Sequence, residues 1–72
     1  MKILIRQHRL FLTWNNYWID SPDKALSFQT GVEAIDYVAQ RGLLNVELFY
    51  SFDNVSDNFS VPLGAGTGTS KN

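Results

Sequence analysis

Apolar side chains recur at helical spacing between residues 31 and 41, which predicts an amphipathic helix there. Thr30 and Glu33 form a capping box, in which the threonine hydroxyl accepts from the Glu33 amide and the glutamate reaches back to the amide of the cap residue. Arg41 followed by Gly42 is typical of a helix end. The apolar face of the predicted helix consists of Val32, Ile35, Val38 and Ala39.

Two other segments alternate with the period of a β-strand. In residues 46–52 every second side chain is apolar, as in a strand with one buried face. Residues 2–14 predict one long strand or two short ones, because the apolar parity changes between Ile5 and Leu10. A bulge or bend near residues 6–9 would reconcile the two halves.

Asn15 and Asn16 predict a two-residue hairpin turn, since asparagine tolerates the positive φ of a type I′ turn. A second strand over residues 17–20 would then pair Thr13 with Trp18, and the two tryptophans would point to opposite faces. We assign to the core face Leu10, Leu12, Trp14, Tyr17 and Ile19. The side chains expected to face away from the helix are Phe11, Trp18 and Phe49.

The chain after Asp53 loses this regularity. Ser21 before Pro22 predicts a short helical turn in the corner between hairpin and helix, whereas residues 54–72 are rich in Gly, Ser, Thr, Asn and Asp. Residues 64–72 are expected to be disordered. The segment FSVPL, residues 59–63, alternates and could add a strand to its own chain or to a partner, or remain disordered.

These elements predict an α+β fold. It has ββαβ order, with a three-stranded, mainly antiparallel sheet, its first strand in the centre and one helix packed on one face. Residues 1–53 form this domain, and residues 54–72 form a partly disordered C-terminal extension.

One long stretch carries a resemblance. FLTWNNYWIDSPDKALSFQTGVEAIDYVAQRGLLNVEL, with Trp18, the SPDKA corner, Phe28 and the capped helix before Gly42, resembles small uncharacterised ββαβ domains of phage and bacterial genomes. The resemblance covers about half of the chain. It implies the same fold, and compact proteins of this kind include phage-borne inhibitors of host defence as well as unrelated accessory modules.

Composition narrows the setting. The chain has 72 residues, no cysteine and a net charge of −1, which fits one small domain in a reducing compartment and favours the cytoplasm. No apolar run is long enough to span a bilayer, so we expect no membrane partner. The positive charges Lys2, Arg6 and Arg9 fall within the first nine residues.

The residues offer little catalytic chemistry. His8 is the single histidine, and a strand-borne surface histidine without a partner base is a poor candidate for catalysis. GAGTGTSK, residues 64–71, lacks the spacing of a phosphate-binding loop. With no cysteine and one histidine a transition-metal site is not expected. We therefore expect no enzyme activity, no cofactor and no metal.

Protein binding remains the expected function. A lone helix covers one face of the sheet, and an apolar patch on the other favours a docking surface. The expected partner-binding residues are Arg6, Arg9, Phe11, Trp18 and Phe49. The patch would be covered by the C-terminal tail, by a second copy in a homodimer, or by a different protein.

Within this class we hypothesise a phage or mobile-element inhibitor that binds a bacterial enzyme or CRISPR-type complex stoichiometrically. The alternative is a single-stranded nucleic-acid-binding protein that uses Arg6, Arg9, Phe11 and Trp18. The face assignment predicts that Trp14→Ala destabilises the fold by about 3–5 kcal/mol, whereas Trp18→Ala changes stability little and weakens association.

Overall fold

The protein is described by a computed structural model covering residues 1–63. Its one α-helix in that range is α1 (Gly31–Arg41), and two 3-10 turns are η1 (Pro22–Lys24) and η2 (Val55–Asp57). The strands are β1 (Lys2–Gln7), β2 (Leu10–Leu12), β3 (Trp18–Ile19), β4 (Ser27–Phe28), β5 (Val46–Ser51) and β6 (Phe59–Leu63).

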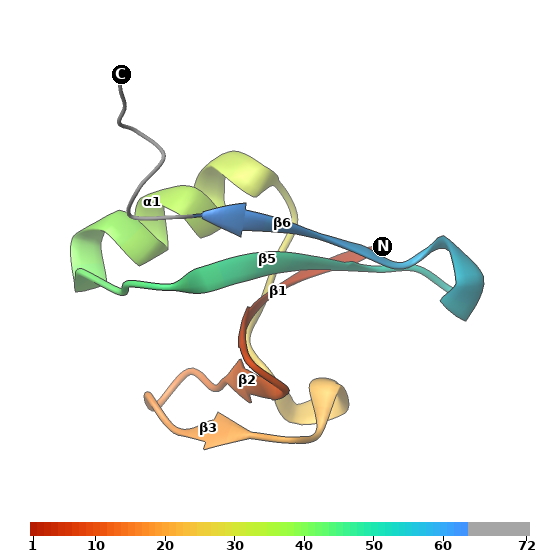
Figure 1. Cartoon of the computed structure of the whole chain (residues 1–72), viewed down its shortest axis with the longest axis horizontal. Helices are drawn as coiled ribbons and strands as arrows, with labels where there is room; N and C mark the ends of the chain where they lie inside the picture. The colour runs from red at the N-terminus through yellow and green to blue at the C-terminus, as the bar shows by residue number, and fades with distance from the viewer. Residues whose placement is uncertain (64–72) are drawn as a thin grey trace.

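The strands form one antiparallel sheet in the order β3-β2-β1-β5-β6 (Figure 1), and β4 also pairs with β1. β5 occupies one edge of β1 along most of its length. The opposite edge of β1 is shared, because Ile3 and Leu4 pair with β4 whereas Arg6 and Gln7 pair with β2. The predicted central position of the first strand is confirmed.

The prediction of a three-stranded sheet is wrong, since the sheet has six strands. β4 is only two residues long, too short for an alternating pattern to be recognised. β6 pairs with β5 from Phe59 to Leu63, so FSVPL packs on its own chain. Pro62 is accommodated there because β6 is an edge strand, where a residue without an amide donor is tolerated. The predicted disorder of residues 64–72 concerns a segment outside the described residues.

The β2–β3 hairpin has a longer loop than predicted. The Thr13 amide donates to the Tyr17 carbonyl at 2.8 Å, the Asn16 amide donates to the Thr13 carbonyl at 3.0 Å, and Asn16 has a φ of 70°. This is a β-turn followed by one left-handed residue, a common three-residue hairpin loop. Leu12 therefore pairs with Trp18.

The extra loop residue reverses the predicted faces, because a one-residue slip in register moves every side chain of a strand to the other face. Trp18 packs against the core, whereas Trp14 is 73% exposed and Tyr17 is also exposed. Placing Trp14 and Tyr17 in the core is therefore wrong. Leu10 is exposed as well, and only Leu12 of that predicted set belongs to the buried cluster.

The parity change near residues 6–9 is a tight turn. Arg6 pairs with Phe11 and Gln7 with Leu10, which leaves His8 and Arg9 as the two loop residues. His8 has a φ of 59°, and a two-residue hairpin loop requires such a conformation at its first position. Of the two predicted alternatives, two short strands is therefore correct.

Helix α1 has the predicted limits. Thr30 Oγ1 accepts from the Glu33 amide at 3.2 Å, and Glu33 Oε1 accepts from the Gln29 amide, one residue before the predicted donor, the Thr30 amide. Gly42 ends the helix in the left-handed conformation with a φ of 65°, which glycine adopts without a steric penalty.

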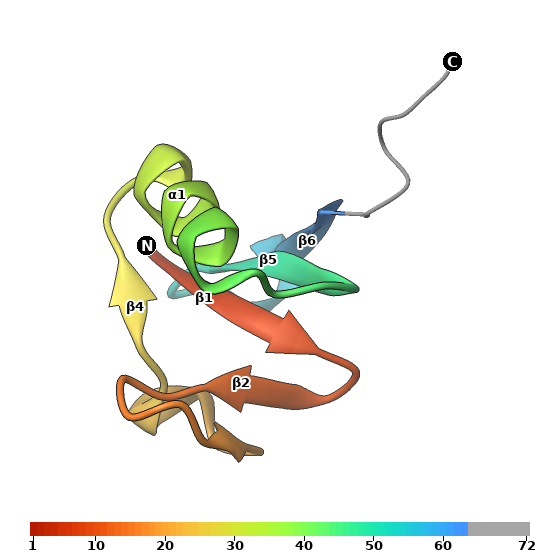
Figure 2. The same ribbon diagram turned by 90° about the vertical axis from the view of Figure 1, so that its left-hand side faces the viewer.

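The main core lies between α1 and the sheet. The helix packs over β1 and β4 and contributes Ala34 and Val38. β6 forms the edge of the sheet beyond β5, away from β4 (Figure 2). Val32, Ile35 and Ala39, which helical spacing assigns to the buried face, are exposed. The buried cluster consists of Ile3, Ile5, Leu12, Ala34, Val38, Val46 and Leu48.

Candidate functional site: an apolar groove between the helix and the edge strand

Three of the expected partner-binding residues meet on the sheet face opposite α1. The rings of Phe11 and Phe49 are in edge contact, with centroids 5.6 Å apart. The Arg6 guanidinium carbon lies 4.6 Å from the Phe49 centroid, and its Nε pairs with Glu47 at 2.5 Å. The structure thus brings Arg6, Phe11 and Phe49 together around a partly buried ion pair.

This cluster forms a small second core. Phe11 is only 7% exposed, and Leu4, which pairs with Phe49 on the same face, is 1% exposed. The Arg6 side chain is engaged by both Glu47 and Phe49. The Phe11 ring therefore has no free face on which a base or another side chain could stack.

The other two expected residues lie elsewhere. Trp18 is on the helix side of the sheet, paired with Leu12 and packed against the main core. Arg9 is exposed in the β1–β2 turn. The five residues therefore do not form a single surface.

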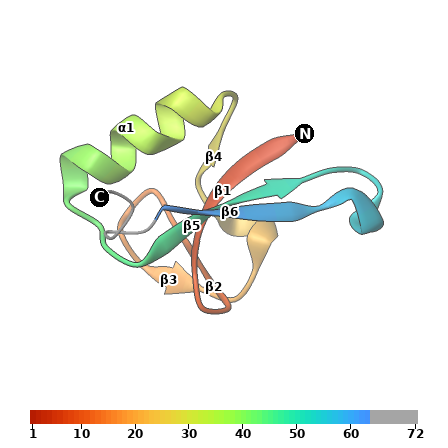
Figure 3. The ribbon, with the colours of Figure 1, turned by 45° about the horizontal axis from the view of Figure 1, so that its top comes forward.

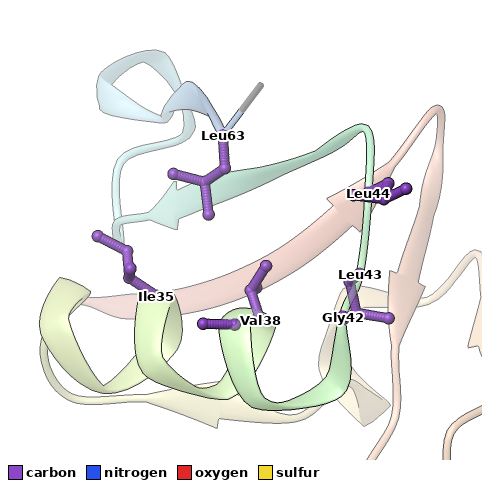
Figure 4. A pocket seen from close by; sticks show the side chains of 7 residues that line it. Ile35, Val38, Gly42, Leu43, Leu44 and Leu63 are labelled. Carbon is purple, nitrogen blue, oxygen red and sulfur yellow. The ribbon is translucent and has the colours of Figure 1, made fainter. Parts of the chain in front are cut away.

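A different apolar surface lies between α1 and β6. It is a groove of about 370 Å³, hereafter the α1–β6 groove. Leu63 points from the end of β6 toward the helix, and Ile35 and Val38 point back toward it (Figure 4). Its lining consists of Ile35, Val38, Ala39, Gly42, Leu43, Leu44 and Leu63.

The groove is open because the helix covers only part of the sheet. α1 lies over β1 and β4 and does not reach the edge strand β6. Leu63 and Val61 of β6 pair with the core residues Val46 and Leu48 of β5, and so lie on the helix side of the sheet. Leu44 is 62% exposed and Ile35 is 48% exposed. Val61 and Phe59 continue this half-exposed apolar face along β6.

Sequence reasoning missed the groove because it assigned the whole apolar stripe of α1 to the core. The stripe is wider than the contact with β1 and β4, since Ala34 and Val38 are buried while Ile35 and Ala39 are not. The sequence did contain a signal for the groove, because the apolar residues of the helix cover two adjoining flanks and one contact surface needs only one of them.

A second exposed feature is the tip of the β2–β3 hairpin, where Trp14 and Tyr17 are exposed. The loop is held by hydrogen bonds that Thr13 Oγ1 makes with Asn15 Oδ1 at 2.9 Å and with the Tyr17 amide at 3.0 Å. On its other side, Asn16 is bound to the helix. The tip therefore presents two large rings on a fixed loop.

That link to the helix runs through Arg41. Its Nη1 donates to Asn16 Oδ1 at 2.8 Å, and its guanidinium carbon lies 4.7 Å from the Tyr37 ring centroid. Arg41 thus joins the C-terminal end of α1 to the hairpin tip and leaves a positive charge beside the exposed rings.

A polar depression of about 410 Å³ lies next to the β1–β2 turn. It contains His8 and the Arg6–Glu47 pair. Within residues 1–63 no three side chains of His, Cys, Asp or Glu are grouped as metal ligands usually are. The same range holds no helix with the length and apolar character needed to cross a bilayer.

Comparison with protein-family models found no match, and neither curated proteins nor solved structures gave one.

Proposed function

We propose that this chain is a non-enzymatic protein-binding module whose contact surface is the α1–β6 groove. The observation that carries the proposal is the gathering of half-exposed aliphatic side chains from the helix, the following loop and the edge strand around one concavity. Contiguous apolar surface of this kind is uncommon on a protein that acts without a partner.

The lining favours a segment of protein as the occupant. All seven lining residues are aliphatic or glycine, whereas sites for small molecules also place a few polar groups that fix the ligand's orientation. A groove bordered by a helix and a strand suits an amphipathic segment that lays down one apolar face. The helix lines the groove from Ile35 to Gly42, which at 1.5 Å per residue gives a wall of about 10 Å.

The proposed surface lies on the opposite face of the sheet from Arg6, Phe11 and Phe49. Binding through aliphatic side chains also separates this proposal from a single-stranded nucleic-acid binder, which would use stacked rings and phosphate contacts. An inhibitor of a bacterial enzyme or CRISPR-type complex stays a prediction about the partner.

Selection from a displayed library of random peptides on the immobilised full chain tests the proposal. Leu44→Ser and Ile35→Ser should each weaken the selected peptides at least about tenfold, because each removes an apolar contact of the groove. Val55→Ser is the matched control. Val55 is also exposed, but it lies in η2, at the far end of the β5–β6 hairpin from the C-terminal end of α1 (Figure 3).

Two results would contradict the proposal. One is a failure to select any peptide whose binding depends on Leu44 or Ile35. The other is binding of a single-stranded oligonucleotide that weakens steeply with added salt, the behaviour of phosphate contacts, together with peptide binding that is indifferent to both groove variants.

A further inference from the structure

The described residues carry two apolar surfaces without a partner, and one is concave whereas the other projects. The concave surface is the α1–β6 groove, and the projecting one is the hairpin tip, formed by Trp14 and Tyr17. We propose that the hairpin tip of one copy binds in the α1–β6 groove of a second copy. This inference rests on the groove of the proposed function and names its occupant.

One surface is concave and the other projects from a fixed loop. The groove has an aliphatic lining, against which aromatic rings bury large apolar areas, about 150–250 Å² each. Trp14 is 73% exposed and Tyr17 is 66% exposed, so both rings have surface to bury. The hydrogen bonds of Thr13 already fix the loop, which lowers the entropy lost on binding.

The charges near the two surfaces do not oppose the contact. Arg41 lies beside the tip, bound to Asn16. None of the residues that line the groove is charged, so a docked tip would bring the guanidinium to a lining without a like charge. The net charge of −1 adds little general repulsion between copies.

One copy cannot fill its own groove with its own tip. Arg41 contacts Asn16 and lies over Tyr37, and helical spacing places Tyr37 and Arg41 on the flank of α1 opposite Ile35 and Ala39. Tip and groove therefore lie on opposite flanks of the helix. A contact between different patches of identical chains is heterologous and repeats head to tail, either into a ring or into an open series.

The nearest rival occupant is the chain that follows Leu63. Its sequence, GAGTGTSKN, contains no apolar side chain larger than the methyl group of alanine. It offers nothing to bury in an aliphatic groove, because burial free energy scales with apolar area.

Light scattering of the full chain over a range of concentrations gives the first test. The mean mass should rise above that of one chain as concentration increases, as mass action requires. Trp14→Ser removes the tip and Ile35→Asp blocks the groove, so each variant alone should have the mass of one chain. Val55→Ser should associate like the wild type.

Mixing the two blocked variants is the decisive measurement. Ile35→Asp keeps its tip and Trp14→Ser keeps its groove, so an equimolar mixture should form a discrete complex of two chains that grows no further. Circular dichroism of each variant establishes that it is folded before mixing. A pair of folded variants that stays at the mass of one chain would overturn the proposal.

Three further results would count against it. A wild-type chain with the mass of one copy at every concentration overturns the inference, and so does association that survives both blocked variants. If the wild-type chain has the mass of one copy and association appears only after deletion of residues 64–72, that segment is the occupant of the groove. These results concern only self-association. The proposed function is tested by the selected peptides whose binding depends on Leu44, and so it can hold when the present inference fails.

Discussion

Leu12 pairs with Trp18 across the β2–β3 hairpin, and both side chains lie on the helix side of the sheet. This pairing places Trp18 against the core and sends Trp14 into solvent.

Trp18→Ala should lower the free energy of unfolding by about 2–4 kcal/mol, since removing a large side chain that packs against a core loses burial and leaves a cavity. Trp14→Ala should change it by less than about 0.5 kcal/mol, as is usual for exposed positions. Urea unfolding at low protein concentration measures both without a contribution from association. A larger loss for Trp14→Ala would restore the two-residue turn predicted from the sequence.

Asn16 has a positive φ and accepts a hydrogen bond from Arg41. Asn16→Ala should destabilise the fold by about 1–2 kcal/mol, because alanine has no side-chain acceptor and adopts left-handed φ at a cost. Asn16→Gly loses the same acceptor but tolerates the conformation. The difference between these two variants in chemical unfolding isolates the backbone term, and equal losses would show that the hydrogen bond alone matters.

His8 occupies the first loop position of the β1–β2 turn with a φ of 59°. His8→Gly should raise the unfolding free energy by about 1 kcal/mol, because glycine removes the steric cost of a positive φ. Arg9→Gly, at the neighbouring loop position without a positive φ, should give no such gain. Thermal unfolding of the two variants provides the comparison, and stabilisation by both would mean that loop flexibility is the cause.

Gly31, the first residue of α1, lies close to the Tyr50 hydroxyl. A Cβ at residue 31 would lie 2.7 Å from Tyr50 Oη, so Gly31→Ala should displace the Tyr50 ring, which stacks on Phe59 with centroids 4.6 Å apart. In a Tyr50→Phe background the same substitution should be about 1 kcal/mol more favourable. A double-mutant cycle by chemical unfolding measures this coupling, and a value near zero would show that Tyr50 moves aside freely.

Local signals in the sequence located the helix well. Thr30, Glu33 and Gly42 act through backbone groups a few residues away, so their roles follow from spacing alone. The alternation of β5 was equally informative, since Val46 and Leu48 are buried on one face. These elements depend on interactions within one segment.

The errors arose where the outcome depends on distant contacts or on one loop residue. A two-residue and a three-residue hairpin loop both fit Asn15 and Asn16, yet they place Trp18 on opposite faces. β4 is a strand only because β2 pairs with the C-terminal end of β1 alone and leaves the rest of that edge free for Phe28 and Ser27. A segment of two residues is too short to contain an alternating pattern that would predict this pairing.

The candidate site was the least predictable part. Helical spacing with Val38 predicted that Val32, Ile35 and Ala39 would also be buried in the core. Whether they are covered depends on where the helix axis crosses the sheet, a relationship set by α1 packing on β1 and β4. The groove therefore became visible only once the tertiary arrangement was known.

β1 is bordered by β5 on one edge and by β4 and β2 on the other, which has a consequence for biosynthesis. Residues 2–7 leave the ribosome before the partner of their longer edge, residues 46–51, has been synthesised. On that edge the backbone groups of β1 stay without hydrogen-bonding partners from β5 until β5 has also left the exit tunnel. The sheet therefore closes around β1 only after β5 has been synthesised, because the two paired strands are far apart in the sequence.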